Sequence, residues 1–433
     1  MKREELTTQL RAPYDPKRGC GVAKTPEEGY ENIWFVVPPP PPRTPPAKLP
    51  LKAMAKAAEI LARQTELSAM GGIDKLIAYY FVRREAVESS RIEGTWSTID
   101  HVLTPGELQD DGASPDARQS VRGYAHALET HLARAESKKE RVFTLKTILD
   151  IHREIVAKDP NFRGEAGVLR APNRIGSVVQ IGGSFRKEES TYNPAPPRFV
   201  ASSLKSALAW LSDEELAQRG DAGVSGFTLP VRLAVAHAHF EAVHPFSDGN
   251  GRVGRALWPL QMACAGRMPL YLSGFVEAYR GDYSRALQAA QKRLSYGDLI
   301  EFVCEAVLRS DAEGSASRAA IEGLPARWRA RARFRGSSTA LRALELLQRM
   351  PIVTIAVLVD ELRVTKQAAR VALEQLMERG VVRNRGRAGR TQLFAAEELI
   401  SLLSRPFGSD AEAALKKGRA LLTSRAAHHG ENA

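Results

Sequence analysis

The chain has 433 residues, which is long enough for two or three domains with a substantial buried core. Its apolar fraction of 43% and charged fraction of 26% are typical of a soluble globular protein. Lys and Arg outnumber Asp and Glu by 62 to 50, so the formal net charge is +12 and an anionic partner is expected. Charge alone leaves nucleotide, nucleic acid and membrane surface open as that partner.

The three cysteines lie far apart, at Cys20, Cys264 and Cys304, and no Cys-x-x-Cys pair exists. This spacing excludes a zinc ribbon and a disulfide framework. The polar N-terminus lacks the apolar core of a signal peptide, and no apolar run is long enough to span a bilayer. These features predict a reduced, cytoplasmic setting.

The N-terminal stretch is polar over residues 1–31 and is expected to be loosely ordered. Five consecutive prolines, Pro38 to Pro42, follow a short apolar run. Such a run favours polyproline II and cannot form the interior of a helix. We interpret it as a stiff strap laid across the surface; an SH3-type ligand is the alternative.

Apolar residues then recur at helical spacing over most of the chain as far as residue 308. The exception is residues 164–197, where Gly, Pro, Asn and Ser are frequent and alternation around residues 175–181 predicts a short hairpin. Pro259 is expected to kink or shorten its helix. The predicted helices are 51–67, 73–92, 118–135, 144–158, 198–213, 231–243, 256–265, 279–292 and 299–308.

The C-terminal part begins with an expected linker, residues 311–338, in which every second residue from 327 to 335 is Arg. Helices are predicted at 340–350, 354–362 and 365–379, with a tight turn at Arg363-Val364. Two short segments around a Gly/Arg loop follow. This order predicts a winged helix-turn-helix, a DNA-binding fold; a module used only for protein contacts is the alternative. Candidate DNA contacts are Lys366, Gln367 and Arg370 on the recognition helix, and Arg383, Arg385, Arg387 and Arg390 in the wing.

The most informative stretch is the loop from His244 to Arg255, which holds one imidazole, one carboxylate, three glycines, one amide and two guanidinium groups. It separates two predicted helices, and the glycines lie where the second helix begins. Free backbone N–H groups and the positive end of the helix dipole meet at such a position and bind anions. The loop is therefore expected to bind phosphate.

Two other interpretations of this loop are weaker. Residues 249–254 match G-x-G-x-x-G, but a dinucleotide site needs a preceding strand, and residues 231–243 are periodic as a helix. A metal site from His237, His239 and His244 is also disfavoured. Residues two apart on a helix point to different faces, so the first two histidines cannot chelate one ion.

Residues 244–255 match H-x-F-x-[DE]-G-N-G-R-x-x-R at every specified position, and this string resembles the signature of the Fic (filamentation induced by cAMP) family. The resemblance covers most of residues 30–308. Gly167 to Arg170 and the segment 175–181 resemble that family's flap, and residues 270–273, followed by Tyr283, resemble the segment that closes its nucleotide pocket. Ala278-Tyr279 departs from an Asn-containing stretch often found there. The implied fold is mainly α: an all-helical Fic core with a short β-hairpin flap, plus a small winged helix-turn-helix domain.

The resemblance implies an enzyme that transfers AMP from ATP, with Mg²⁺, to a hydroxyl of a target protein. A base near neutral pH, a carboxylate for the metal and donors for the phosphates suit that reaction. The implied roles are His244 as general base, Asp248 as metal ligand, and Gly249, Asn250, Gly251, Arg252, Arg255 and Tyr283 as nucleotide-binding residues.

Ser89 to Gly94 resembles the inhibitory motif of the same family, [ST]-x-x-x-E-[GN]. The resemblance implies that Glu93 pairs with Arg255 in the place of the ATP γ-phosphate, while Ser89 steadies the helix end. Gly94 is a suitable C-terminal cap, and an ordinary capped helix is the alternative.

The expected organisation is an N-terminal region 1–115, a catalytic core 116–310, the linker 311–338, the winged helix 339–405 and a tail 406–433. A DNA-binding regulator that uses the Fic domain as a nucleotide sensor remains an alternative. Transfer of another group (UMP, phosphocholine or phosphate) or removal of AMP also remains open. Besides ATP and a target protein, duplex DNA and a second copy of the chain are candidate partners; a membrane is not expected.

Overall fold

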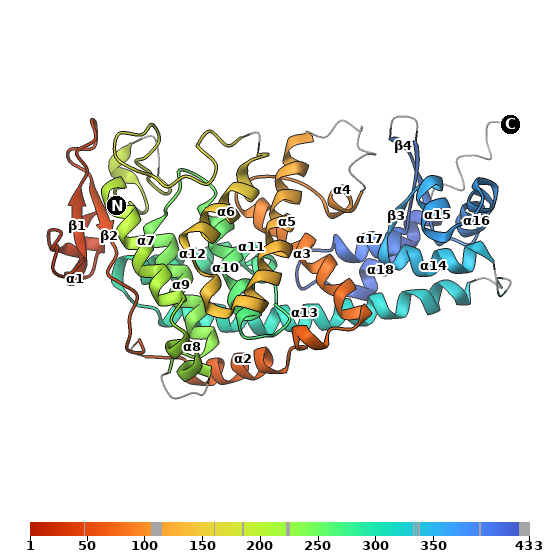
Figure 1. Cartoon of the computed structure of the whole chain (residues 1–433), viewed down its shortest axis with the longest axis horizontal. Coiled ribbons are helices and arrows are strands. Elements are labelled where there is room, and N and C mark those ends of the chain that lie inside the picture. Colours follow the sequence, from red (N-terminus) through yellow and green to blue (C-terminus); the bar gives the residue numbers. More distant parts are fainter. Residues whose placement is uncertain are drawn as a thin grey trace. The chain divides into compact units, whose positions relative to one another are not determined.

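The structure is a computed structural model that describes residues 1–46, 48–104, 115–159, 161–183, 186–221, 226–331, 334, 336, 338–388 and 391–423 (Figure 1). The chain forms two compact units. The first contains residues 1–70, 88–94 and 123–311, and the second contains residues 71–87, 95–122 and 312–433. Helices α3 (Gly72–Ile92), α5 (Pro115–Lys138) and α13 (Gly297–Ala330) contribute residues to both.

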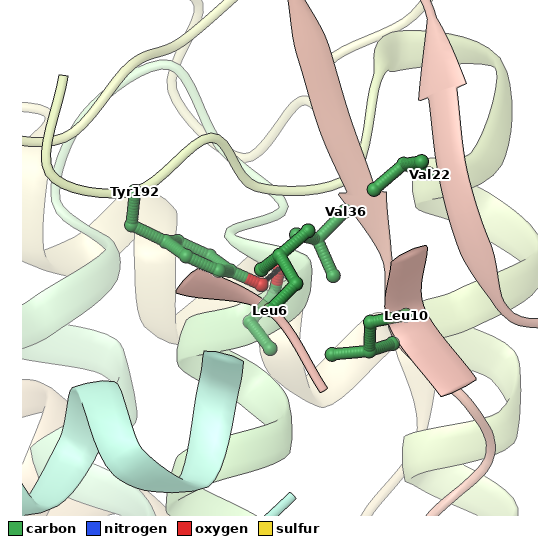
Figure 2. Packing of buried hydrophobic residues seen from close by; sticks show 6 residues of the cluster. Leu6, Leu10, Val22, Val36 and Tyr192 are labelled. Atoms are coloured by element: carbon green, nitrogen blue, oxygen red, sulfur yellow. Dashed lines mark hydrogen bonds between the residues drawn. The ribbon is translucent and has the colours of Figure 1, made fainter. Parts of the chain in front are cut away.

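The N-terminal segment of the first unit is ordered. The expectation that residues 1–31 are loosely ordered was therefore wrong. A short 3₁₀ turn, η1 (Arg3–Glu5), and α1 (Thr8–Arg11) precede two antiparallel strands, β1 (Gly21–Lys24) and β2 (Trp34–Val37). A few apolar side chains, too widely spaced to form a periodic pattern, anchor the segment. They form the buried cluster Leu6, Leu10, Val22, Val36, Tyr192 and Ala242 (Figure 2).

The proline run follows β2 and lies against the first unit's helices. The indole N–H of Trp210 donates to the carbonyl of Pro42 at 2.9 Å, and Arg43 pairs with Asp213 at 2.7 Å. Both partners lie at the end of α7 (Pro197–Leu211) or just beyond it. These contacts agree with the interpretation of the run as a strap; Ala47 lies outside the described residues.

Helix α9 (Leu229–Val243) is the centre of the first unit, and all of its residues are buried. A helix that is apolar on all sides must be covered on all sides. Helices α2 (Leu51–Arg63), α7, α10 (Asn250–Cys264) and α12 (Arg280–Arg293) pack against it. The unit also contains α6 (Leu145–Val156), α8 (Glu214–Asp221) and α11 (Ser273–Ala278), and the short turns η2 (Leu67–Ala69), η4 (Lys139–Val142) and η5 (Lys187–Glu189).

Helix α10 continues through Pro259 to Cys264, so the proline does not shorten it. Pro259 and its neighbours are buried, and the Trp258 indole donates to the Leu233 carbonyl of α9 at 3.1 Å. Tertiary packing therefore outweighs the one hydrogen bond that a proline removes from the helix.

Helix α13 corrects the expected linker, because it extends to Ala330. Its C-terminal part buries an apolar stripe in the second unit, and the Trp328 indole donates to Glu398 at 2.8 Å. The alternate arginines masked this stripe in the sequence. Of these, Arg327, Arg329 and Arg331 pair with carboxylates, whereas Arg333 and Arg335 lie outside the described residues.

The second unit follows the expected order of helix, short helix, turn, helix and hairpin. Its elements are α14 (Thr339–Arg349), β3 (Ile352–Val353), α15 (Ile355–Leu362), α16 (Lys366–Glu378), β4 (Arg383–Ala388) and β5 (Thr391–Ala395). The antiparallel strands lie in the order β3-β5-β4. Ser338, Thr354 and Thr365 each cap a helix by accepting a backbone N–H three residues on.

Helices α4 (Ile99–Leu103), α17 (Glu397–Leu403) and α18 (Ala411–Thr423) complete the second unit. Arg390 and the end of the tail, residues 424–433, lie outside the described residues. Among the described residues, no helix combines the length and the apolar character that crossing a membrane requires.

Candidate active site

The loop between α9 and α10 begins at His244, whose backbone is left-handed (φ 50°, ψ 65°). Its N–H donates to the Phe240 carbonyl at 2.8 Å, so His244 caps α9 and also turns the chain. Gly249, at φ 79°, starts α10. A Cβ there would lie 2.8 Å from a methyl carbon of Val156, so only glycine fits this turn. The N-terminus of α10, with its free N–H groups, therefore lies at the end of the loop.

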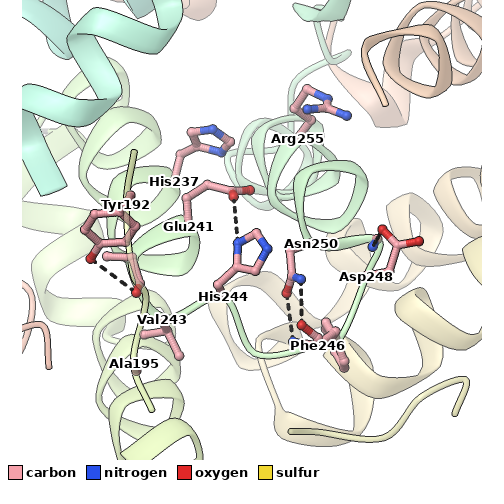
Figure 3. Close-up of polar contacts among 12 residues, drawn as sticks. Tyr192, Ala195, His237, Glu241, Val243, His244, Phe246, Asp248, Asn250 and Arg255 are labelled. Atoms are coloured by element: carbon pink, nitrogen blue, oxygen red, sulfur yellow. Dashed lines mark hydrogen bonds and ion pairs between the residues drawn. The ribbon is translucent and has the colours of Figure 1, made fainter. Parts of the chain in front are cut away.

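Asn250 holds the loop closed. Its side-chain oxygen accepts the Phe246 N–H at 2.8 Å, and its amide nitrogen donates to the Phe246 carbonyl at 2.9 Å (Figure 3). Both ends of the buried amide are thus occupied. One of the two amide hydrogens is thus used inside the loop, and the contact of Asn250 with a nucleotide phosphate stays a prediction.

His152, on α6, packs against the loop and forms a hydrogen bond with it. Its ring stacks on Phe246, with centroids 3.7 Å apart. Its Nδ1 accepts the Gly167 N–H at 2.9 Å, so Nε2 carries the proton and donates to the Asp248 carbonyl at 3.0 Å. Burial lowers the pKa of His152 to about 4, and the ring is neutral near pH 7.

Glu241 faces His244 from the preceding turn of α9, as Figure 3 shows. Its Oε2 lies 3.5 Å from the imidazole Nδ1, and the two side chains are 7% and 16% exposed. Burial opposes ionisation of Glu241. The contact with His244, together with the charges of His237 and Arg255, outweighs burial and lowers the pKa of this carboxyl.

Arg170 joins the flap to the loop. Its guanidinium is buried and donates to four carbonyls at 2.8 to 3.0 Å, those of Ser177, Ala195, Val243 and His244. The backbone N–H of Arg170 donates to the Pro245 carbonyl at 2.9 Å. Burial lowers the pKa of Arg170 to about 9, so the group stays protonated at neutral pH. The flap's own arms pair at one antiparallel bridge, between Ile181 and Tyr192, and the Gln180 amide donates across the flap to the Lys187 carbonyl at 2.7 Å.

Asp248 points outward and is exposed. Its Oδ1 accepts the N–H of Gly249 at 2.6 Å. The described residues contain no cluster of three or more His, Cys, Asp or Glu side chains that could hold a metal by themselves. An exposed single carboxylate suits Mg²⁺, which takes one or two protein carboxylates and completes its shell with phosphates and water.

The two motif arginines have different partners. Arg252 is buried and pairs with Asp159 at 2.7 Å. Its guanidinium thus faces a carboxylate of the protein's own core, whereas a contact with the nucleotide phosphates was expected. Arg255 donates through Nε to the Ser89 hydroxyl at 2.8 Å and through Nη2 to Glu93 at 2.7 Å.

The Glu93 carboxylate lies over the start of α10. A Cβ on Gly251 would lie 2.2 Å from Glu93 Oε1 and 2.9 Å from an Arg255 nitrogen. Gly94, at φ 84°, ends the helix that carries Ser89 and Glu93. Burial alone would lower the pKa of Arg255, but Glu93 outweighs it and raises that pKa. A negative group therefore already occupies the position that the helix N-terminus offers to an anion.

Tyr283, on α12, is half-buried, and its hydroxyl lies 2.7 Å from Nε2 of His237. Burial raises the pKa of this phenol. His237 in turn contacts the Trp258 ring, with centroids 4.4 Å apart. Tyr283 thus contacts α9 through His237, and its contact with a nucleotide stays a prediction.

In the second unit, the candidate DNA contacts fall into two groups. Lys366, Gln367 and Arg370 are exposed on the first turns of α16. Arg383 and Arg385 instead pair with the buried Glu397, and Arg385 also pairs with Asp100 at 2.7 Å. Arg383 and Arg385 are therefore neutralised within their own unit, whereas Arg387 is exposed and Arg390 lies outside the described residues.

Four residues of the first unit were missed or underestimated by sequence reasoning: His152, Asp159, Arg170 and Glu241. Glu241 could have been found, because it precedes His244 by one helical turn and is a lone carboxylate in an apolar helix. Arg170 was placed in the flap without a role. Nothing in the pattern around His152 or Asp159 indicates that they meet the loop.

Two segments of the chain are similar to one known protein family. Residues 142–262 match the family described as Fic/DOC family, and residues 51–133 match its N-terminal region. Protein adenylyltransferase fic-1 of Caenorhabditis elegans is 33% identical over 204 residues, which cover 46% of this chain and 34% of that protein. A probable protein adenylyltransferase of Aquifex aeolicus is 29% identical over 182 residues, which cover 41% and 47% of the two chains.

Among solved structures, a Fic family protein from Desulfovibrio desulfuricans covers 82% of this chain and 98% of its own, with a TM-score of 0.47 and 19% identity. Fic-1 from C. elegans covers 61% and 69%, with a TM-score of 0.45 and 23% identity. The chain spans between a third and a half of the length of the curated relatives named above.

Proposed function

Residues 142–262 form a Fic domain, and from this premise we propose that the protein is an adenylyltransferase that transfers AMP from ATP to a hydroxyl side chain of a target protein. The proposal is supported by curated relatives that are named protein adenylyltransferases. It is supported further by the loop, which brings an imidazole and the N-terminus of α10 together. Transfer of another phosphate-containing group and removal of AMP remain alternatives for the same site.

The observation that carries the proposal is the Glu93 carboxylate at the start of α10, held by Arg255 at 2.7 Å. A protein anion in this position marks a site built for a substrate anion, because the positive helix end and the guanidinium both attract negative charge. ATP would replace Glu93 with its γ-phosphate.

In the proposed reaction, Nε2 of His244 removes the proton from the target hydroxyl. The hydroxyl oxygen attacks the α-phosphorus of ATP and forms the new phosphorus–oxygen bond. The bond between the α-phosphorus and the bridging oxygen to the β-phosphate breaks, and pyrophosphate leaves with that electron pair. Backbone N–H groups at the start of α10 stabilise the charge that develops on the α-phosphate.

Asp248 is the residue proposed to hold Mg²⁺, since its exposed carboxylate leaves room for phosphate and water ligands. Mg²⁺ would neutralise charge on the phosphates when bound. Arg255 would hold the γ-phosphate once Glu93 has left it. Arg252, paired with Asp159, is now proposed to support the first turn of α10.

The contact between Glu93 and Arg255 is proposed to inhibit the enzyme. A hundredfold loss of ATP affinity corresponds to about 2.7 kcal/mol. The test is incubation with ATP and Mg²⁺, followed by intact-mass measurement of the protein and of lysate proteins. Glu93→Gly is expected to raise AMP transfer, and His244→Ala should abolish it in that background.

Each outcome decides one part. If Glu93→Gly transfers no AMP to itself or to any lysate protein, AMP transfer is refuted. If it transfers AMP no faster than the unmodified chain, only inhibition by Glu93 is refuted. AMP transfer that persists in His244→Ala would refute the role of His244 as general base.

A second function, DNA binding by the C-terminal elements as a winged helix-turn-helix, is supported by the exposed Lys366, Gln367 and Arg370 on α16. The pairing of Arg383 and Arg385 with Glu397 removes these two residues from the proposal and leaves the exposed Arg387 in the wing. A gel shift on duplex DNA at low and high salt tests it. Salt-sensitive binding that is lost in Lys366→Ala/Arg370→Ala would support it, and no binding at low salt would refute it.

The three cysteines, all buried and unpaired, support a reduced and therefore cytoplasmic setting.

A further inference from the structure

Glu241 is a carboxylate inside an otherwise uncharged part of α9, and the proposed reaction gives it no role. Its residue is 5% exposed, and Oε1 has no hydrogen-bond partner among the described residues. Burying a carboxylate in this way is costly unless a nearby positive or donating group compensates for it. The nearest candidate is the His244 ring, with Nδ1 at 3.5 Å from Oε2.

The backbone brings these two side chains together. Residues three apart on a helix are neighbours on one face, so His244 at the end of α9 lies beside Glu241 one turn earlier. The left-handed backbone of His244, with φ 50°, ends the helix at this point. This conformation is unfavourable for a residue with a side chain and persists only where its surroundings enforce it. Arg170 supplies that enforcement through the carbonyls of Val243 and His244.

The remaining surroundings leave Nδ1 facing Glu241. The other charged or titratable groups that act on Glu241 are His237 on the same helix and Arg255 on α10. His237 is engaged by Tyr283, and Arg255 by Ser89 and Glu93. Gly254 of α10 leaves room for the Glu241 side chain, because a Cβ at residue 254 would lie 2.3 Å from Glu241 Oε1.

A neutral imidazole carries its single proton on either nitrogen, and the partner of one nitrogen decides the state of the other. A carboxylate facing Nδ1 accepts a hydrogen bond from an N–H there and has no hydrogen of its own to donate. Nδ1 then keeps its hydrogen, and the lone pair is left on Nε2.

We propose that Glu241 is a positioning residue that holds His244 as the Nδ1–H tautomer, so that Nε2 is free to take the proton of the target hydroxyl. The inference rests on the proposed transferase function. Glu241 does not touch substrate; it acts through the ring, and its carboxylate also stabilises the imidazolium that forms when His244 accepts the proton.

The kinetic test uses the Glu93→Gly background, in which AMP transfer is measured with ATP and Mg²⁺. Glu241→Leu removes the acceptor without leaving a buried charge, and Glu241→Gln keeps an oxygen that can accept from Nδ1. We expect kcat to fall about tenfold to a hundredfold in the Leu variant and by less in the Gln variant, with KM for ATP unchanged. Glu140→Gln is the matched control, because Glu140 faces Arg232 near the opposite end of α9.

The spectroscopic test is ¹⁵N NMR of histidine-labelled protein at a pH where the ring is neutral, with the signal assigned by its absence in His244→Ala. The unmodified chain should show Nδ1–H, and Glu241→Leu should shift the ring toward Nε2–H. An unchanged tautomer, or an unchanged kcat in a Leu variant that folds, would overturn the inference.

These outcomes are separate from those of the proposed function. If the Glu93→Gly background is itself inactive, the transferase proposal fails, while the NMR result still decides the tautomer. If that background is active and the Leu variant loses activity through a raised KM for ATP alone, Glu241 shapes the nucleotide site and the positioning role is refuted.

Discussion

His239 is a buried histidine of α9 whose pKa is lowered by burial. The residue is 3% exposed, and burial lowers the pKa of its imidazole to about 4, although a hydrogen bond with the Ser203 backbone opposes the shift. The ring is therefore neutral in the folded chain over a pH range in which an unfolded histidine is charged. Its role is structural, in contrast to His244 at the end of the same helix.

The difference between the pKa of His239 in the folded chain and in the unfolded chain predicts a loss of stability in acid. The pKa in the unfolded chain is about 6.5, so the unfolded state binds more protons between pH 6.5 and 4, and stability falls as pH decreases through that window. At pH 5 the loss from His239 is about 2 kcal/mol relative to pH 8. Urea unfolding at both values measures it. His239→Gln, which does not titrate, should depend less on pH, and an equal dependence would contradict the assignment.

At the scale of elements, the flap and the loop behave as one structure because Arg170 joins them. One guanidinium accounts for four backbone carbonyls from three segments. A carbonyl buried without a partner costs about 1–3 kcal/mol, so the loss of this side chain cannot be local.

Arg170→Met keeps a long apolar side chain and removes all four donors. We expect the free energy of unfolding to fall by about 3 kcal/mol or more and AMP transfer in the Glu93→Gly background to be lost even at a temperature where the variant is folded. Circular dichroism reports folding, and the mass assay reports transfer. Arg174→Met is the control, since Arg174 pairs only with the exposed Glu165. Full activity of a folded Arg170→Met chain would show that the strained backbone of His244 needs no clamp.

The elements themselves were largely predictable, but their connections were not. Apolar periodicity predicted α9 and α10, and the residue types between them predicted a phosphate-binding helix start. The partners of Arg252 and Arg255 differ in this respect: Glu93 lies in a motif, whereas Asp159 is an isolated carboxylate after α6. The expected linker was wrong because arginines dominate its composition, while the helix is specified by four buried apolar residues, Ala320, Ile321, Leu324 and Trp328. Contacts between distant segments are set by tertiary packing, which local patterns do not encode.

For the whole molecule, the contact between Glu93 and Arg255 links ATP binding to stability. A ligand that binds only the folded state raises the free energy of unfolding by RT ln(1 + [L]/Kd), which is about 2.7 kcal/mol at a hundred times Kd. Because Glu93 occupies the proposed γ-phosphate position, ATP with Mg²⁺ should raise the melting temperature more in Glu93→Gly than in the unmodified chain. Differential scanning fluorimetry measures this, and Glu93→Gly/Arg255→Ala should lose the shift. Equal shifts with and without Glu93 would mean that it does not compete with ATP.

The position of Glu93 over Gly251 has one more consequence. In the proposed inhibition the carboxylate belongs to the same chain as the site, so its effective concentration at α10 would be fixed by a short helix end and would not change on dilution. Such inhibition would not depend on how many copies of the protein a cell makes. It would leave the same fraction of molecules active in a cell with ten copies as in one with ten thousand, and the ATP concentration or an event that moves the end of α3 would change that fraction.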